Sequence, residues 1–233
     1  MNVPLEPRHV VDTAARLRRR VGERFPASGL EKIAASLVVL AEGADARGRE
    51  IARPHLPLRG AVWLLTGALL AGLAATFHGV SAAPGFASLA DLLQGVDAAA
   101  NIVLLLGAGV LSLSRLEDSI RRRKALALVH ELKELAHVID MHQLTKDPET
   151  VSGEAPRTES SPKRSMTRWE LGRYLDYSSE MLSLLGKIGA IYGRRLQDAV
   201  VLEAIDGAED LFTGLSRKIW QKIAILGENA PKA

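Results

Sequence analysis

The sequence contains no cysteine among its 233 residues. This excludes disulfide bonds and thiolate catalysis, and it leaves any metal site to histidine and carboxylate side chains. Aromatic residues make up only 4% of the chain, too few for the stacking platform of a single-strand nucleic-acid binder. The chain also lacks a P-loop, a G-x-S-x-G elbow, an H-E-x-x-H motif and zinc-finger spacing. We therefore predict no cofactor and no nucleic-acid partner.

Charge is missing from one long segment, Gly60–Val80. A helix that crosses a bilayer needs roughly 20 mainly apolar residues, and this segment meets that requirement. A second apolar segment, Val96–Leu113, is shorter and carries Asp97 and Asn101 near its start. Together the two segments predict a transmembrane helical hairpin over 60–114.

Lysine and arginine are also absent between the two segments, from Ser81 to Gly95. By the positive-inside rule this distribution predicts that both termini lie in the cytoplasm. Residues 1–25 are rich in arginine and have no continuous apolar core, so we do not expect a cleavable signal there. The basic residues flank the outer ends of the segments: Arg47, Arg49, Arg53 and Arg59 before the first, and Arg115, Arg121, Arg122, Arg123 and Lys124 after the second.

Abundant alanine, leucine, glutamate and arginine, with few β-branched or aromatic runs, predict an all-α fold. The bilayer would be one partner of such a chain. We divide it into a cytosolic arm (1–59), the transmembrane hairpin (60–114), a membrane-proximal helix (115–144), a proline-rich flexible linker (145–166), a C-terminal helical hairpin (167–227) and a tail (228–233).

The arm begins with an amphipathic helix whose apolar face carries Val10, Ala14, Leu17 and Val21. This face either lies on anionic lipid or packs against other helices while the arginines are solvated. The residues expected at a lipid surface are Arg16, Arg19 and Arg20 in the arm and Arg121, Arg122, Arg123 and Lys124 after the second span.

A second arm helix is predicted by the capping-box pattern of Ser28 and Glu31, and we expect it to run to about Glu42. Four helix-weakening residues then argue against its continuation into the membrane as one straight helix. They are Gly43, Gly48, Pro54 and Pro57.

The C-terminal part carries another capping box, Thr167 with Glu170, and Asp198 is expected to cap the helix that follows. Because so few residues separate the two helices, we expect them to pack antiparallel. Their predicted contact residues are Leu171, Leu175, Leu182, Leu185 and Tyr192 on the first helix and Ile205, Phe212, Leu215 and Ile219 on the second.

Small residues recur in the predicted spans. Gly67, Ala71 and Ala75 repeat every four residues, and Gly107 and Gly109 lie in the other span. Small side chains let helix backbones approach closely in lipid. We therefore predict helix packing through these residues, and a homo-oligomer.

The densest group of titratable residues lies in the membrane-proximal helix. His130, Glu134 and His137 are spaced by four and three residues, and Asp140 follows three residues later. One helical face with these side chains suits a metal ion. The alternative is a surface of ordinary ion pairs, because one helix rarely supplies a closed site.

Three strings resemble those of bacterial two-span membrane proteins without an assigned activity: His137–Pro148, Tyr177–Leu184 and Gly214–Ile223. The layout is similar to that of the SLATT class of two-span effectors, and this likeness implies pore formation when a partner senses a nucleotide signal. The resemblance implies the bacterial inner membrane as the location.

Our leading hypothesis is a non-enzymatic membrane protein that self-associates, or binds a cytosolic protein partner, through its cytosolic helices. Signalling or pore formation would require an oligomer, because two helices do not enclose a pore. The alternative hypothesis is a membrane-tethered metal-binding enzyme that uses His130, Glu134, His137 and Asp140.

Overall fold

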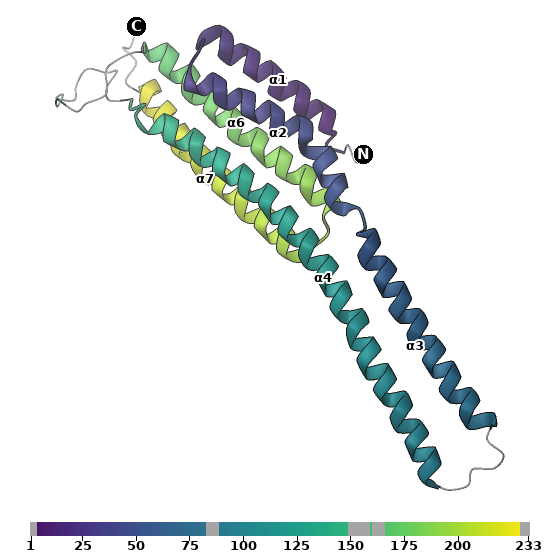
Figure 1. The fold of residues 1–233 in the computed structure, drawn as a ribbon. Coiled ribbons are helices and arrows are strands. Elements are labelled where there is room, and N and C mark those ends of the chain that lie inside the picture. Colours follow the sequence, from purple (N-terminus) through teal and green to yellow (C-terminus); the bar gives the residue numbers. More distant parts are fainter. Residues whose placement is uncertain (1–3, 83–88, 149–158, 160–165, 229–233) are drawn as a thin grey trace. The chain divides into compact units, whose positions relative to one another are not determined.

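A computed structural model describes residues 4–82, 89–148, 159 and 166–228, and in these residues the protein is entirely helical, as predicted (Figure 1). Most of the expected linker, 145–166, and most of the tail, 228–233, lie outside the described residues. The helices are α1 (Pro7–Arg24), α2 (Gly29–Ala52), α3 (Leu56–Ala82), α4 (Leu89–Leu144), α6 (Arg168–Arg195) and α7 (Ala199–Glu228).

The chain divides into two compact units. One, called the bundle below, comprises Met1–Ala52 and Lys124–Ala233 and contains α1, α2, α6, α7 and the C-terminal half of α4. The other, called the hairpin, comprises Arg53–Arg123 and contains α3 and the N-terminal half of α4.

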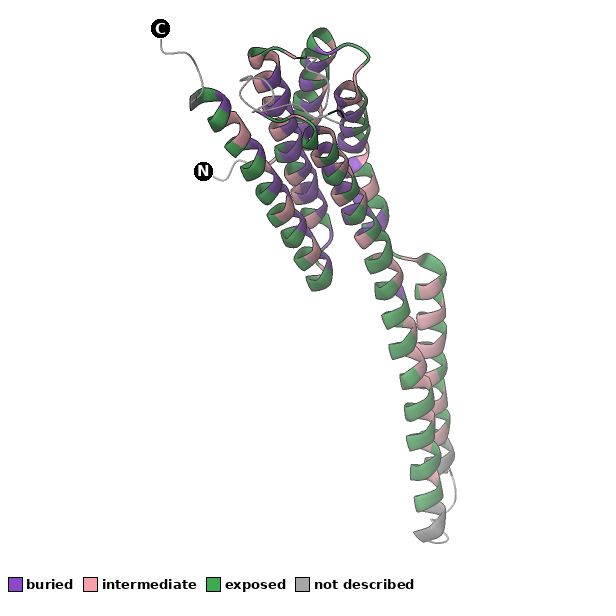
Figure 2. Cartoon of the chain, turned by 90° about the vertical axis from the view of Figure 1, so that its left-hand side faces the viewer, coloured by how far each residue is buried: buried purple, intermediate pink, exposed green. Residues whose placement is uncertain are grey.

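Helix α6 is the central helix of the bundle and packs against α7, α2 and α1. The expected pairing of α6 with α7 is present, and all nine predicted contact residues on these helices are at most 5% exposed. A second buried stripe runs along α6, and sequence analysis missed it. It consists of Tyr174, Tyr177, Met181, Leu184, Ile188 and Ile191, and its steps of three and four residues were visible in the sequence. Figure 2 shows that burial in the bundle is concentrated on the faces that the helices turn toward one another.

The C-terminal half of α4 completes the bundle. Leu132 is buried, and its Cδ1 lies 3.8 Å from the position that a Cβ on Gly189 of α6 would occupy. An ion pair of 2.7 Å joins Arg47 of α2 to Glu131 of α4. The ammonium of Lys222 on α7 donates to the backbone oxygen of Gln143, 2.9 Å away.

The apolar face of α1 packs inside the bundle. Val10, Ala14, Leu17 and Val21 are all buried, and α1 contacts both α2 and α6. Of the two interpretations of this face, the structure supports packing against other helices. The arginines of α1 lie on the opposite, exposed side.

Helix α2 is longer than the sequence predicted. It continues past Glu42, through Gly43 and Gly48, to Ala52, so the expected end was wrong by ten residues. At Gly48 a Cβ would lie 3.4 Å from Cγ of Arg195, so this part of α2 packs against α6. Pro54 provides the stop, because proline disfavours helical geometry in the residue before it. Tertiary packing therefore outweighed the low helix propensity of glycine.

The predicted starts of α6 and α7 are confirmed. Thr167 accepts from the backbone N–H of Glu170, and the Glu170 carboxylate accepts from the backbone N–H of Thr167, so the capping box is complete. These hydrogen bonds, led by the one from the Thr167 backbone, lower the pKa of Glu170. The Asp198 carboxylate accepts from the N–H groups of Val200 and Val201 at the start of α7.

Replacing a fully buried leucine of α6 should cost much more stability than replacing a half-exposed leucine of α7. Leu175 is 0% exposed and Leu202 is 40% exposed. We expect Leu175→Ala to lower the free energy of unfolding by about 2–5 kcal/mol, because the cavity cannot close completely. The matched control Leu202→Ala should cost less than about 1 kcal/mol. Chemical denaturation of the full chain in mild detergent, followed by circular dichroism, measures both; equal losses would contradict the buried position of Leu175.

Tyr174 should make the bundle sensitive to alkali. Its ring packs edge-on against Phe25, with centroids 5.5 Å apart, and burial raises its pKa to about 12. In the unfolded chain the phenol ionises near its ordinary pKa of 10, so the unfolded state loses this proton first. The stability that Tyr174 contributes is complete below pH 10 and is lost as the pH rises toward 12.

We expect Tyr174→Phe to reduce the loss of stability between pH 10 and 12, and to remove a tyrosinate that titrates near pH 12 in ultraviolet absorbance. At neutral pH the variant should be nearly as stable as the wild type, because the hydroxyl makes only a 3.4 Å contact with the backbone oxygen of His142. The same alkaline slope in both proteins would refute this role.

Candidate functional site

The two helices of the hairpin run antiparallel and contact each other at two glycines, of which one was predicted. A Cβ placed on Gly72 would lie 3.4 Å from Cγ2 of Ile102, and one on Gly109 would lie 3.4 Å from Cδ1 of Leu65. Gly109 was among the predicted packing residues, whereas Gly72 was missed because it lies outside the repeat of Gly67.

The predicted repeat on α3 does not form the contact between the two helices. Gly67, Ala71 and Ala75 are all exposed. Within the described residues, a Cβ on Gly67 or on Gly107 would meet no atom within 4 Å. The small-residue face of α3 is therefore open in a single chain, and packing through it stays a prediction about a second chain.

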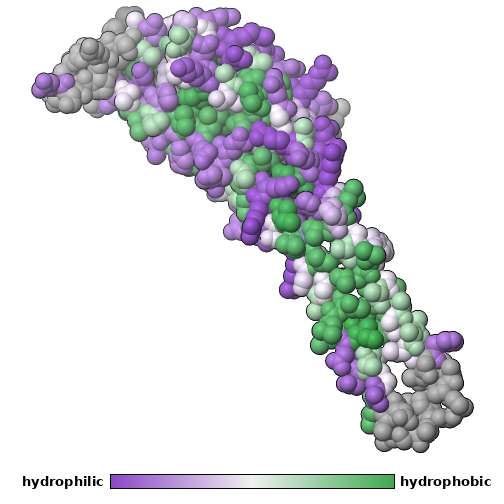
Figure 3. All heavy atoms as spheres, in the orientation of Figure 1, coloured by the Kyte–Doolittle hydropathy of each residue, from purple (hydrophilic) through white to green (hydrophobic). Residues whose placement is uncertain are grey.

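The open faces of the hairpin are strongly apolar. Large side chains that are 62–77% exposed line both helices: Trp63, Leu64 and Leu70 on α3, and Leu104, Leu105 and Leu111 on α4. Figure 3 shows this hydrophobic surface along the hairpin, and hydrophilic atoms over much of the bundle. Both helices are long and apolar enough to cross a membrane, and their most apolar stretches are not buried within the structure.

One buried carboxylate ties the base of the hairpin together. Glu117 of α4 is 8% exposed, and its Oε1 accepts from the backbone N–H of His55 at 3.2 Å. The same oxygen lies 3.5 Å from Nε of Arg59 and 2.8 Å from Nη2 of Arg121. Arg121 is thus held by Glu117, while Arg122, Arg123 and Lys124 are exposed. Contact of these residues with lipid stays a prediction.

In the arm, the three predicted lipid-contact arginines have different surroundings. Arg20 forms a bidentate ion pair with Glu180 of α6, at 3.0 and 3.1 Å, and its guanidinium lies 5.1 Å from the ring centre of Tyr177. Arg16 donates to Thr13 within α1, and Arg19 is exposed. Arg20 therefore has a structural partner in the bundle, and sequence analysis could not assign it because Glu180 is 160 residues away.

The histidine-rich face of α4 does not assemble a metal site in the part of the chain that the structure describes. His130 pairs with Glu134 at 3.1 Å, and both side chains are about two-thirds exposed or more, at 73% and 66%. Asp140 accepts from the side chain of Gln143 at 2.6 Å, and His137 is exposed. The described residues contain no group of three or more metal-binding side chains placed to hold an ion.

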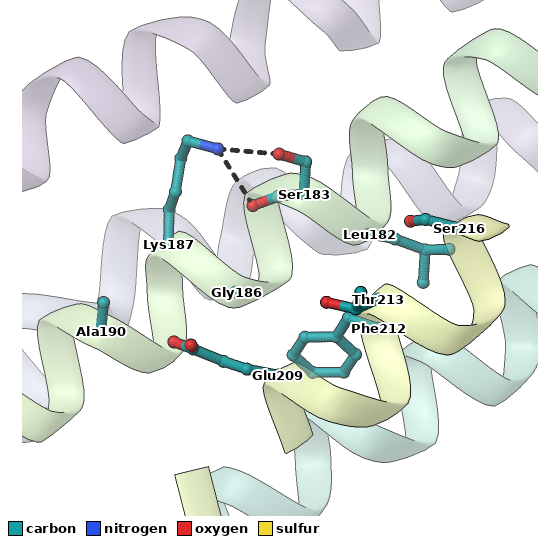
Figure 4. Close-up of a pocket in the computed structure, with 9 residues that line it drawn as sticks. All are labelled: Leu182, Ser183, Gly186, Lys187, Ala190, Glu209, Phe212, Thr213 and Ser216. Carbon is teal, nitrogen blue, oxygen red and sulfur yellow. Dashed lines mark hydrogen bonds between the residues drawn. The ribbon is translucent and has the colours of Figure 1, made fainter. Parts of the chain in front are cut away.

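A shallow groove of about 380 Å³ lies between α6 and α7 (Figure 4). The ammonium of Lys187 donates to the hydroxyl and the backbone oxygen of Ser183, at 2.8 and 3.3 Å, and Glu209 contributes a carboxylate from α7. Its lining has no histidine, and in its hydroxyl–amine pair, Ser183 with Lys187, the lysine donates to the serine. The lining residues are Leu182, Ser183, Gly186, Lys187, Ala190, Glu209, Phe212, Thr213 and Ser216.

The pair formed by Arg20 and Glu180 should stabilise the bundle modestly. Because both side chains are 39–45% exposed, we expect a coupling of about 0.2–1 kcal/mol in a double-mutant cycle of Arg20→Ala and Glu180→Ala, and a smaller value in high salt. Arg19→Ala is the matched control and should show no coupling to Glu180→Ala. Zero coupling for Arg20 at low salt would contradict the assigned pair.

Comparison with protein-family models, with curated proteins and with solved structures finds no match to this chain. What the protein does therefore has to be inferred from its own residues and geometry.

Proposed function

We propose that this is an integral membrane protein, anchored by the α3–α4 hairpin, whose bundle lies on the cytosolic side. The observation that carries the proposal is the contrast between the two units. The bundle covers most of its leucine, isoleucine and valine side chains with its own helices, whereas the hairpin leaves large apolar side chains open along both helices. In water such a continuous apolar surface favours aggregation, while in a bilayer it contacts hydrocarbon at no such cost.

The dimensions agree with this location. Helix α3 has 27 residues, which at 1.5 Å per residue gives about 40 Å. The hydrocarbon core of a bilayer is about 30 Å thick, so α3 is long enough to cross it with residues to spare at each end. The apolar half of α4 has similar reach before Arg115.

Charge supports one orientation. Arginine and lysine residues flank the cytosolic ends of the proposed spans, and the segment that connects the spans has none. The resemblance to bacterial two-span proteins makes the inner membrane the proposed location, with both termini in the cytoplasm.

We propose further that the anchored protein acts without catalysis, by self-association and by binding a partner through its cytosolic helices. Two features support this. The groove between α6 and α7 presents mixed charge and apolar surface, and the small-residue face of α3 is open to a neighbouring helix. A pore-forming or signalling effector of this design requires several copies, since one hairpin encloses no channel.

Membrane topology can be tested directly because the chain has no cysteine of its own. We expect Gln94→Cys, near the connection between the spans, to react with a membrane-impermeant maleimide added to intact cells. Lys187→Cys in the bundle should react only after lysis. The wild-type protein should also resist extraction from membranes by alkaline carbonate.

Labelling of Lys187→Cys in intact cells would refute the orientation. Release of the wild-type protein by carbonate would refute the membrane anchor itself. The reaction of each variant in detergent is the control that both cysteines are accessible.

A further inference from the structure

Helix α4 carries a second heptad stripe in its apolar half, and this stripe points away from α3. The stripe that includes Ile102 and Gly109 faces α3, as the close approaches to Gly72 and Leu65 show. On the opposite side, five exposed residues follow one another in steps of four, three, four and three. They are Asp97, Asn101, Leu104, Ala108 and Leu111, and we call them the α4 seam.

The seam contains a polar side chain, Asn101, at a depth where lipid offers no hydrogen bonds, and this side chain is hydrogen-bonded to Asp97. Nδ2 of Asn101 donates to Oδ2 of Asp97 at 3.2 Å. Asn101 precedes Arg115 by 14 residues, which corresponds to about 21 Å along the helix. If Arg115 marks the cytosolic edge of a core about 30 Å thick, the amide lies inside the hydrocarbon and Asp97 lies near its far edge.

Among the residues that the structure describes, nothing in a single hairpin covers this pair, and both side chains are exposed. The seam is on the side of α4 opposite to α3, so the carboxamide would face acyl chains directly. Polar groups in a bilayer are costly unless they face protein or water, and two helices enclose no water-filled channel. The rest of the seam is apolar or small, as in the contact stripe of a helix that packs on another helix.

We propose that a second copy of this chain covers the α4 seam, through a parallel contact between α4 of one chain and α4 of its partner. The proposal rests on the membrane location proposed above. All copies insert with the same orientation, so a symmetric α4–α4 contact has its two-fold axis along the membrane normal and brings equivalent residues to the same depth.

That symmetry makes the seam self-complementary at Asn101 and at the apolar residues that follow it. The bond to Asp97 uses one of the two N–H groups of the Asn101 carboxamide, and its carbonyl oxygen is an acceptor. In the parallel pair the two carboxamides meet at the same level and bond to each other. Leu104, Ala108 and Leu111 pack on the cytosolic side of them. A single asparagine in an apolar heptad stripe is a known means of fixing helix register and oligomeric state.

Cysteine crosslinking in native membranes tests the seam, again on a background without cysteine. We expect Leu104→Cys, Ala108→Cys and Leu111→Cys to form disulfide-linked dimers on mild oxidation. The control Val103→Cys lies at the same depth as Leu104 but off the seam, and it should give at least severalfold less dimer than Leu104→Cys. Ala71→Cys reports on the small-residue face of α3.

The outcomes separate this inference from the proposed function. Crosslinking at Ala71→Cys but at none of the seam positions would overturn the seam and leave a membrane oligomer intact. Equal crosslinking at Val103→Cys and at the seam positions would also overturn it. Carbonate extraction of the uncrosslinked protein would instead overturn the membrane anchor, and the seam with it.

A second variant tests the role of the amide. Asn101→Leu keeps the size of the side chain and removes its hydrogen bonds, so it should weaken dimerisation about 3- to 20-fold, as measured by energy transfer between labelled chains in liposomes. Val103→Leu is the control and should leave dimerisation unchanged. A dimer of Asn101→Leu as tight as that of the wild type would overturn the proposed role of the amide.

Discussion

The structure depends on one constraint: each apolar helix surface must be covered by protein or by hydrocarbon. Helix α6 has apolar stripes on two faces, and both are covered, one by α7 and the C-terminal half of α4 and the other by α1 and α2. Each hairpin helix is covered on one face only. The bundle meets this constraint with its own helices. The remaining apolar faces of the hairpin need lipid or a further chain to cover them.

Charge defines the end of the hairpin at which this apolar surface stops. Glu117 lies on α4, yet it binds the backbone of His55 and the guanidinium of Arg59 just before and within the start of α3. Such a buried carboxylate is stable only because cations and an N–H group surround it. The ion cluster fixes the two helices at their base, and the basic residues that follow it on α4 are exposed where the proposed bilayer would present its headgroups.

Periodicity predicted the helices well because it reports directly on burial. The end of α4 at Leu144, the capping box at Thr167 and the pairing of α6 with α7 all followed from local pattern. The predictions that failed concerned contacts between residues that are distant in the sequence. Helix α2 continues through Gly48, where it packs against Arg195 of α6, and Arg20 pairs with Glu180 of the same helix. Choosing between Gly72 and Gly67 as the α3 contact required the rotation of α3 against α4, which no single-helix pattern contains.

The two open faces of the hairpin have different consequences for assembly. A symmetric contact through the α4 seam uses the same surface on both chains, so it closes at two copies. A ring or a pore needs a second, different contact that repeats around an axis. The exposed repeat of Gly67, Ala71 and Ala75 is on another helix, and small residues of this kind permit close helix packing without polar specificity. We infer that the seam, with Asn101, sets which chains pair and in what register, whereas the α3 face decides whether pairs join into something larger. In this scheme α4 forms the dimer, and any pore would require contacts through α3 between such dimers.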